Sequence, residues 1–396
     1  MSENFVLDGK TKSIDFGEEE VRFLKVLRAS LDLAIDRGQE ENAEMLRKLI
    51  EMGQRISSSL EIDVIIETTL KSLVEVAGAK CCALGLFDKK TGEIALKKSP
   101  ESSNKSQIRA ERVQAEGTIL GEVTKTGQPM VIEDLANYEG SLCLPDCSNG
   151  MRSAAVFPVQ AGGRIHGALI VCTPFALDRK GNEVGYLSII TSQVGLAIEN
   201  AQLYESLREY YMNVVNALTA ALEAKDKYTQ GHSLRVALWA KEVAKEIGLS
   251  DKEQEMIYIG GLLHDIGKVG VREQILLKTD KLTPEEEKEI HTHPRTGARI
   301  MEPANLPKEV VEAVLYHHED YDGGGYPEGI AGEKIPLLPR IIRVVDSYDA
   351  MKSDRPYRKA FSKKWVIEEL NRCSGKQFDP VVVEAMIKLI EQGKLA

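Results

Sequence analysis

Apolar and polar residues follow different patterns in successive parts of the chain. Residues 18–57 place apolar side chains at helical spacing along one side, with charged residues opposite and a break at Arg37–Gly38. This pattern predicts a pair of amphipathic helices, and we assign residues 1–57 to an N-terminal helical segment. Such helices bury their apolar side either on their own domain or on another chain, and the pattern is compatible with both.

Residues 58–202 combine helical periodicity with short β-rich stretches. Helices are predicted near residues 63–76 and 120–125, and the glycines after Ala161 predict a hairpin turn between two strands. The β-rich stretches are 81–88, 93–99, 108–115, 153–160 and 164–174. We therefore expect this part of the chain to fold as an α/β sandwich, with an antiparallel sheet and covering helices.

A long helix is predicted next, because no proline interrupts the helical pattern from Glu183 to Lys225. A continuous helix of about 40 residues would be about 60 Å long, which is more than one domain needs. We interpret residues 203–228 as a connecting helix that also pairs with its copy in a homodimer. Residues 229–396 show helical patterns separated by proline- and glycine-rich loops, and are expected to form an all-α domain.

Composition and charge narrow the class of protein. A chain of 396 residues with 43% hydrophobic residues is long enough for two domains with separate cores. Its formal net charge of −10 argues against DNA as a partner, since non-specific nucleic-acid binding needs a basic surface. No window approaches the roughly 20 apolar residues that span a bilayer, and the N-terminus lacks the features of a secretory signal. We expect a cytoplasmic protein without membrane contact.

The six cysteines do not form the paired CxxC units of a zinc site. In a chain of this size we interpret them as reduced thiols. Cys143 and Cys147 also fit a redox pair, although unpaired loop cysteines are the simpler interpretation.

The histidines are unevenly distributed. Six of the 7 lie between residues 232 and 318, and histidine is the commonest metal ligand in proteins. Two adjacent pairs, His264–Asp265 and His317–His318, follow apolar helical stretches. Neighbouring residues on a helix point about 100° apart, so such pairs suit two ions with the Asp265 carboxylate bridging them. The candidate ligands are His232, His264, Asp265, His293, His317, His318 and Asp346.

The types of ligand indicate the kind of metal. Asp346 follows the apolar run 341–345, where a carboxylate without compensation would be costly, and a bound cation would supply that compensation. Mixed imidazole and carboxylate ligands suit iron, manganese or other first-row divalent ions, whereas a structural zinc site would be rich in thiolates. Two such ions with open positions indicate catalysis. We interpret His291 as a core histidine rather than a further ligand.

A series of motifs follows in order through the second half of the chain. They are the His264–Asp265 dyad with Gly267 and Lys268, HPRTG at 293–297, HHE at 317–319, DGGGYP at 322–327, and DSYDAM with DRPYR between 346 and 358. With these motifs, residues from about 220 onward resemble the HD-GYP family, a branch of the HD-type metal-dependent phosphohydrolases. The resemblance implies hydrolysis of cyclic di-GMP to pGpG or GMP by water that two metal ions activate. Other cyclic dinucleotides, including a mixed guanine–adenine one, are alternative substrates.

The resemblance also implies roles for individual residues. The seven candidates named above would hold the metals, with Asp265 as a catalytic residue. Lys268 would act in catalysis and, together with Arg355, bind the scissile phosphate. Tyr326, from the GYP motif, would shape the substrate pocket.

One position departs from the family pattern. A further family motif is YTQGH at 228–232, which contains Thr229 and His232. Some members carry a glutamate just before this threonine, where it helps to hold a third metal, and here that position is Tyr228. We therefore expect two ions, although Glu223 and Asp226 are close enough in sequence to contribute. Asp349, three residues after Asp346, is expected to orient a ligand from behind.

The first half resembles a GAF domain, a small-ligand sensory module, across about residues 58–202. The resemblance rests on the order of helices and strands and on FPV at 157–159 followed by GALIV at 167–171. We find no NKFDE-type signature of the cyclic-nucleotide-binding members, so the small ligand is unknown. A ligand pocket, a redox response and a purely dimerising role are the open alternatives. The two resemblances together predict a GAF-regulated cyclic di-GMP phosphodiesterase, and the alternative is a non-hydrolytic receptor or scaffold for the dinucleotide.

Overall fold

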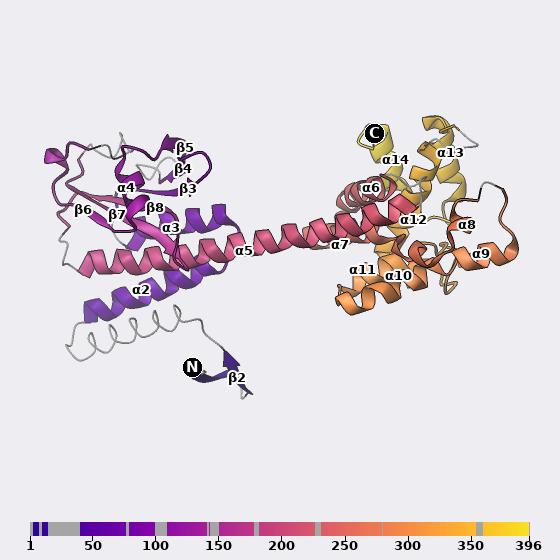
Figure 1. Cartoon of the computed structure of the whole chain (residues 1–396), viewed down its shortest axis with the longest axis horizontal. Helices are drawn as coiled ribbons and strands as arrows, with labels where there is room; N and C mark the ends of the chain where they lie inside the picture. The colour runs from indigo at the N-terminus through magenta and orange to yellow at the C-terminus, as the bar shows by residue number, and fades with distance from the viewer. Residues whose placement is uncertain are drawn as a thin grey trace. The chain divides into compact units, whose positions relative to one another are not determined.

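The computed structural model describes residues 3–7, 10–14, 40–76, 79–99, 109–140, 142, 150–177, 182–225, 231–278, 280–353 and 359–395. The chain divides into two compact units, Met1–Leu207 (unit 1) and Arg208–Ala396 (unit 2). Unit 1 is an antiparallel sheet covered by helices, and unit 2 is helical (Figure 1). The long helix α5 (Asn182–Lys225) contributes to both. The fold class predicted from the sequence is therefore confirmed.

The sheet of unit 1 has six antiparallel strands in the order β5-β4-β3-β8-β7-β6. They are β3 (Cys81–Asp88), β4 (Glu93–Lys98), β5 (Arg109–Gln114), β6 (Met130–Ile132), β7 (Ser153–Ala161) and β8 (Arg164–Thr173). Gly162 and Gly163 adopt φ values of 55° and 74° between β7 and β8, so the predicted hairpin turn is confirmed. The sequence pattern does not predict β6, because three residues are too few to show alternation.

A separate two-stranded ribbon lies near the N-terminus. Its strands, β1 (Glu3–Leu7) and β2 (Lys10–Ile14), pair in antiparallel register. The assignment of residues 1–57 to a helical segment is therefore wrong for these two strands, which precede the helical pattern of residues 18–57. The reason is visible in the sequence, where Asp8–Gly9 is a strong hairpin signal between two short strand-forming runs.

Helices cover both faces of the main sheet (Figure 1). The helices α2 (Glu40–Ser57), α3 (Ile62–Val76) and the first part of α5 share a core with one face, and α4 (Ile119–Thr126) covers the other. From α2, the side chains of Leu46, Leu49, Met52 and Ile56 are at most 5% exposed. The helix α2 thus packs within its own unit, which was one of the two possibilities for this amphipathic pattern. Residues 18–39 lie outside the described residues.

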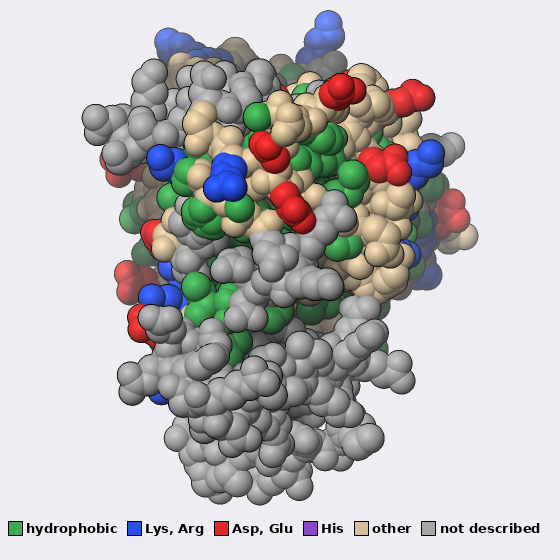
Figure 2. Space-filling model, turned by 90° about the vertical axis from the view of Figure 1, so that its left-hand side faces the viewer, with side chains coloured by type: hydrophobic (Ala, Val, Ile, Leu, Met, Phe, Trp, Pro, Cys, Tyr) green, Lys and Arg blue, Asp and Glu red, His purple; other side chains and the backbone are tan. Residues whose placement is uncertain are grey.

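The surface of unit 1 carries acidic and basic side chains with hydrophobic ones between them (Figure 2). Beside α4 lies a cavity of about 640 Å³. Its lining includes the apolar or aromatic side chains of Phe87, Met130 and Tyr138 and the charged side chains of Glu122 and Lys125. The cavity is therefore suited to a small molecule with both apolar and polar groups.

The cysteines only partly match the expectation of reduced thiols. Cys82, Cys172 and Cys373 are free and buried. Burial raises the pKa of the Cys82 thiol to about 11 and that of Cys172 to about 12, so neither is reactive at neutral pH. Cys81 is disulfide-bonded, so the expectation is wrong at this residue. Cys143 and Cys147, the proposed redox pair, lie outside the described residues.

Unit 2 is built from helices, with no strand among its described residues. The helices α6, α7, α11, α12 and α14 share one hydrophobic core. The bounds are α6 (His232–Ile247), α7 (Asp251–Leu263), α8 (Glu273–Leu276), α9 (Pro284–Ile290), α10 (His293–Met301), α11 (Lys308–Tyr316), α12 (Leu337–Lys352), α13 (Lys363–Cys373) and α14 (Pro380–Glu391).

The helix α5 is continuous, as the sequence predicts. Val194 and Ile198 are buried in the core of unit 1, and Val215 is buried in the core of unit 2. Between them, residues 202–210 are exposed on every side of the helix. Neither α5 nor any other helix in the described part of the chain is both long and apolar enough to cross a membrane.

Candidate metal centre

Carbonyl groups at helix ends orient three of the histidines. His264 and His317 cap the C-termini of α7 and α11, and His293 follows α9 and opens α10. The Nδ1 atom of each lies 2.7 Å from the carbonyl oxygen of the residue three positions earlier. Carbonyls at helix ends lack intrahelical partners and can only accept, so each Nδ1 carries the proton. Each Nε2 is consequently an accepting lone pair that points away from the backbone.

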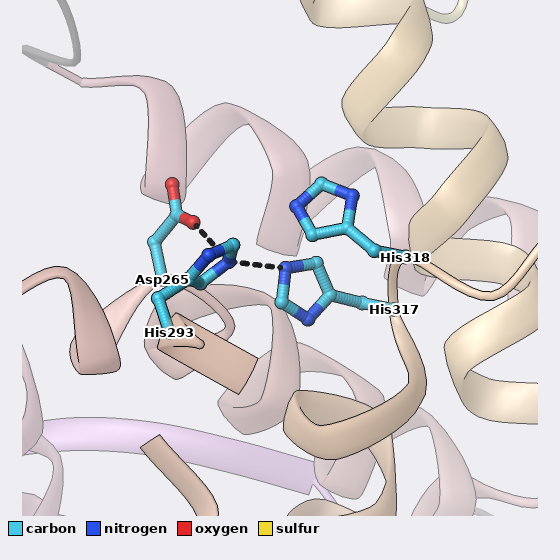
Figure 3. Close-up of side chains that lie close together, drawn as sticks. All are labelled: Asp265, His293, His317 and His318. Atoms are coloured by element: carbon cyan, nitrogen blue, oxygen red, sulfur yellow. Dashed lines mark hydrogen bonds and ion pairs between the residues drawn. The ribbon is translucent and has the colours of Figure 1, made fainter. Parts of the chain in front are cut away.

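Four side chains form the first cluster, Asp265, His293, His317 and His318 (Figure 3). One potential ligand atom from each lies within 4.8 Å of the others. His293 Nε2 lies 3.4 Å from Asp265 Oδ1 and 3.2 Å from His317 Nε2. Two bare nitrogen lone pairs at this separation repel each other unless a positive charge lies against both. The first cluster therefore fits a divalent cation.

Three side chains form the second cluster, His232, His264 and Asp346. They come from the start of α6, the end of α7 and the middle of α12. His232 Nε2 lies 3.3 Å from both His264 Nε2 and Asp346 Oδ1. His264 is 1% exposed and His232 is 8% exposed, so charge in this cluster is shielded from water.

Asp265 lies between the two clusters. Its Oδ1 faces His293, whereas its Oδ2 lies 3.4 Å from His264 Nε2 and 4.0 Å from His232 Nε2. Lys268 Nζ donates a hydrogen bond to the same Oδ2 at 2.6 Å. Because one carboxylate oxygen faces each cluster, Asp265 has the arrangement that a bridging ligand requires.

The protonation states of the first cluster favour a cation. Burial lowers the pKa of His293 to about 4 and holds the pKa values of His317 and His318 well below the ordinary value, so these rings are neutral at pH 7. Burial alone would raise the pKa of Asp265, but Lys268 and the neighbouring histidines hold it well below that of a free carboxyl. The first cluster thus offers neutral imidazoles and an ionised carboxylate, which are the forms that bind metals.

His232 in the second cluster behaves differently. Burial opposes its charge, but hydrogen bonds to Asp346 and Asp349 raise its pKa to about 10. Burial likewise opposes the charge of Asp346, and His232 holds its pKa well below the ordinary value. In the metal-free protein a proton on His232 therefore supplies the positive charge that a cation would bring.

Asp349 orients His232 from behind, as its position in the sequence suggested. Asp349 Oδ2 lies 2.7 Å from His232 Nδ1, and its Oδ1 accepts a hydrogen bond of 2.5 Å from Arg235 Nε. Asp349 is 2% exposed, so its carboxylate is shielded from water. The arrangement fixes the ring of His232 with Nε2 directed at the second cluster.

A glycine allows the segment after Asp265 to approach α10. A Cβ atom at Gly267 would lie 1.8 Å from the carbonyl oxygen of His293, so no larger residue fits without a backbone shift. This contact keeps Asp265 and Lys268 beside the start of α10. Gly267 therefore permits the close approach that places the His264–Asp265 dyad next to His293.

The DGGGYP loop folds back onto the first cluster. The Tyr326 amide donates to the His318 carbonyl at 3.1 Å, and a Cβ atom at Gly325 would lie 2.2 Å from the Asp320 amide nitrogen. The Tyr326 ring stacks on His318 with 4.8 Å between centroids. Burial raises the pKa of the Tyr326 hydroxyl, so this group remains a hydrogen-bond donor at neutral pH.

His291 is an exposed residue, so its interpretation as a core histidine is wrong. It caps the short helix α9 at the surface, and its ring stacks on Tyr326 with 3.9 Å between centroids and 16° between planes. It belongs to neither metal cluster among the described residues. The sequence could not reveal this contact, because the two residues lie in separate loops.

The structure brings the seven candidate ligands together in two clusters and places Lys268 and Tyr326 beside them. Arg355, the second phosphate-binding candidate, lies outside the described residues. Of the three residues considered for a third metal, the structure describes only Glu223. Tyr228 and Asp226 also lie outside the described residues, and Glu223 accepts hydrogen bonds from backbone amides rather than facing a cluster.

Two residues whose roles the sequence did not predict hold the backbone on either side of the DGGGYP loop. Glu319 is 2% exposed and its Oε1 accepts hydrogen bonds from the amides of Glu328 and Gly329, at 2.7 and 3.1 Å. Arg343 on α12 donates to Asp320 Oδ1 at 2.7 Å. The signal for Glu319 was its place directly after the paired histidines, where a buried carboxylate needs partners.

Comparisons with known proteins agree with this architecture. A family model of the HD domain matches residues 216–382, and a family model of the GAF domain matches residues 59–199. The fold and the site thus define a two-domain protein in which a sheet domain that matches the GAF model precedes a helical domain with a candidate metal centre. The chain carries a GAF domain followed by an HD domain.

The chain is also similar to proteins that are named as cyclic-dinucleotide phosphodiesterases. It is 36% identical over 207 residues to a cyclic di-GMP phosphodiesterase of Thermotoga maritima, with 52% of this chain and 56% of the relative covered. It is 38% identical over 205 residues to the cyclic di-GMP phosphodiesterase PA4108 of Pseudomonas aeruginosa, with 50% and 49% covered. It is 35% identical over 214 residues to the 3'3'-cGAMP-specific phosphodiesterase 2 of Vibrio cholerae, with 54% and 40% covered. The chain spans about half the length of the curated relatives it matches.

Proposed function

We propose that this chain is a metal-dependent phosphodiesterase that hydrolyses cyclic di-GMP to pGpG or GMP under the control of its GAF domain. The observation that carries the proposal is the pair of clusters that face the two oxygens of Asp265, with Lys268 bound to the same carboxylate. The relatives described above, all named as cyclic-dinucleotide phosphodiesterases, suggest the class of substrate.

The metals in this proposal are two first-row divalent ions, iron or manganese, because the ligand set is rich in imidazole and contains no thiolate. When bound, the ions would activate water and neutralise charge on the phosphate in the transition state. Their ligands would be His232, His264, Asp265, His293, His317, His318 and Asp346.

The remaining site residues would handle the substrate. Lys268 would direct its ammonium group at a non-bridging phosphate oxygen, because its hydrogen bond to Asp265 already holds it at the clusters. Tyr326 would line the pocket beside His318 and donate its hydroxyl proton in a hydrogen bond. Arg355 would provide the second cation for the phosphate.

The alternative function, a receptor that binds the dinucleotide without turnover, is not favoured by any observation. A receptor would not need a lysine at the carboxylate that both clusters share. The mixed guanine–adenine dinucleotide remains the alternative substrate, because one relative is named as specific for 3'3'-cGAMP.

For the sensory unit, we propose that the cavity beside α4 holds the small ligand of the GAF domain. Its lining combines aromatic side chains, such as Phe87 and Tyr138, with the charges of Glu122 and Lys125. These groups suit an amphipathic small molecule.

We also propose a homodimer that forms through α5. Leu203, Leu207, Tyr210 and Val214 are spaced by four, three and four residues, and they are 56%, 67%, 71% and 60% exposed. This spacing is typical of the seam of a two-stranded coiled coil. A second copy of the same helix would bury the stripe.

Product analysis tests the proposed function. The protein is loaded with Mn²⁺, or with Fe²⁺ under anaerobic conditions, and incubated separately with cyclic di-GMP and 3'3'-cGAMP. Linear products that disappear when a chelator is added would support a phosphodiesterase, and their ratio would identify the preferred substrate. Tight binding of a dinucleotide by the metal-loaded protein without any product would instead support the receptor.

A further inference from the structure

The C-terminal end of α5 touches the segments that carry the candidate ligands. Thr219 Oγ1 donates a hydrogen bond of 3.2 Å to the carbonyl of Leu262, in the last turn of α7 before its histidine cap. Lys225 Nζ donates to the carbonyls of Val269 and Val271 at 2.9 Å each, at the end of the turn that begins with Asp265. The helix that enters unit 2 from the GAF domain is therefore bonded close to the metal centre.

The most specific of these contacts involves Glu223. Its Oε2 accepts a hydrogen bond from the Gly231 amide at 2.8 Å, and its Oε1 accepts one from the Ser233 amide at 3.2 Å. His232, a candidate ligand of the second cluster, lies between these two residues in the chain. The carboxylate of Glu223 is thus hydrogen-bonded to the backbone on both sides of His232, one of the candidate metal ligands.

The start of α6 depends on this contact. Its N-cap residue is Gly231, which has φ of 70° and no side chain that could accept from the first amides of the helix. Amides at a helix N-terminus need acceptors, and a carboxylate there is favoured by the helix dipole. Glu223 supplies from another helix the cap that α6 cannot supply for itself.

The ring of His232 is consequently held by two anchors. Asp349 fixes its Nδ1, and Glu223 fixes the backbone from which the ring projects. The first turn of α6 loses an anchor if the carboxylate is removed, and the ring can then move relative to His264 and Asp346. The first cluster has no residue on α6, so it does not share this dependence.

We infer that Glu223 is a positioning residue that fixes His232 in the second cluster, and that α5 acts through it on the ion held by His232, His264 and Asp346. The inference rests on the proposed two-metal function and deepens it, because it names the contact by which the GAF domain would reach the site. Glu223 does not bind a metal in this account, since both of its oxygens accept backbone hydrogen bonds.

Metal binding by the full-length protein tests this inference without reference to turnover. Bound Mn²⁺ per chain and the Kd of each ion are measured for the wild type, Glu223→Ala, Glu223→Gln and the control Glu253→Ala. Glu253 is a matched control, because its carboxylate accepts from the Ser250 amide at the N-terminus of α7, away from the clusters. Thermal unfolding of the same samples shows whether the two alanine variants lose comparable stability.

We expect Glu223→Ala to keep one ion at wild-type affinity and to bind the other about 10- to 100-fold more weakly, as for loss of a residue that orients a ligand. Glu223→Gln should be intermediate, because its amide oxygen retains one of the two bonds, and it carries the test if the alanine variant does not fold. Two ions at wild-type affinity in both Glu223 variants would overturn the inference. Equally weakened metal binding in Glu253→Ala would also overturn the inference, because the loss of affinity would then reflect general destabilisation. A wild-type chain that binds fewer than two ions would contradict the proposed function itself, and the inference with it.

Discussion

Lys268 Nζ lies 2.6 Å from Asp265 Oδ2, the oxygen that also faces His264. The lysine is held one turn beyond the carboxylate that lies between the two clusters. This hydrogen bond places the ammonium group at the metal centre, where it could bind a phosphate oxygen. In the proposed reaction this group stabilises charge that grows on the phosphate.

Substitution of this lysine should therefore impair turnover rather than metal binding. We expect Lys268→Ala to lower kcat by about 10²- to 10³-fold, the usual cost of removing one group that stabilises the transition state. Bound metal per chain should stay at the wild-type value. Lys278→Ala, which removes a lysine paired with Glu286, is the control and should retain wild-type kcat. A Lys268→Ala enzyme with normal kcat would remove the lysine from the mechanism.

Acid should destabilise metal-free unit 2. The pKa values of His293, His317 and His318 lie below the ordinary histidine value of 6.5 in the folded protein because the rings are buried. As pH falls from about 6.5 to about 5, the unfolded chain binds protons that the folded chain does not, so the free energy of unfolding falls by up to about 1.4 kcal/mol per pH unit for each histidine. Both tryptophans, Trp239 and Trp365, lie in unit 2, so urea unfolding followed by tryptophan fluorescence measures this effect. A constant free energy of unfolding over this range would contradict the neutral state of these rings.

His232 should make the free energy of unfolding depend on pH in the opposite direction. Its pKa is raised to about 10, so the stability that it contributes is complete below about pH 6.5 and is lost as pH rises towards 10. At pH 7 to 8 the ring is protonated in the metal-free protein, and metal binding must displace that proton. Calorimetric titration in buffers of different ionisation enthalpy should show release of about one proton per chain. Asp349→Asn, which removes one of the groups that raise the pKa of His232, should release less than one proton per chain when the metal binds. Metal binding without proton release in the wild type would show that His232 is neutral or does not bind the metal.

The ring of His291 should matter through its contact with Tyr326. Aromatic stacking contributes about 0.5–1.5 kcal/mol, so His291→Ala should raise KM for the dinucleotide by about 2- to 12-fold, with metal content unchanged. His291→Phe, which can still stack, should stay near the wild-type KM. Equal KM values for all three proteins would show that the stack does not shape the substrate pocket.

The exposed stripe on α5 predicts a dimer that a single charge disrupts. Leu207→Glu should place two carboxylates at the seam and shift the protein from dimer to monomer in sedimentation or light-scattering measurements. Leu234→Glu is a matched control, because Leu234 is a leucine of α6 that is 45% exposed outside the stripe. A monomeric wild type, or a Leu207→Glu variant that remains dimeric, would contradict the proposed seam.

The sequence predicts the parts of this protein whose chemistry lies in local patterns. The long helix follows from an uninterrupted periodicity, and the candidate ligands follow from histidines and aspartates beside apolar helical stretches, where few other roles suit them. Contacts between distant residues leave no such trace. The bond from Glu223 to the start of α6, the stack of His291 on Tyr326 and the ion pair of Arg235 with Asp349 depend on how helices pack. The short strand β6 is missed for a different reason, because the sheet rather than its own sequence determines it.

The decisive measurement for the two-metal phosphodiesterase is turnover of cyclic di-GMP by the metal-loaded protein, compared with Asp265→Ala prepared in the same way. Asp265 is the one candidate ligand that faces both clusters, so its removal should abolish the reaction while the GAF domain stays folded. We expect linear product from the wild type and none above background from the variant. Product formed equally by both proteins, or by neither, would contradict the proposed function.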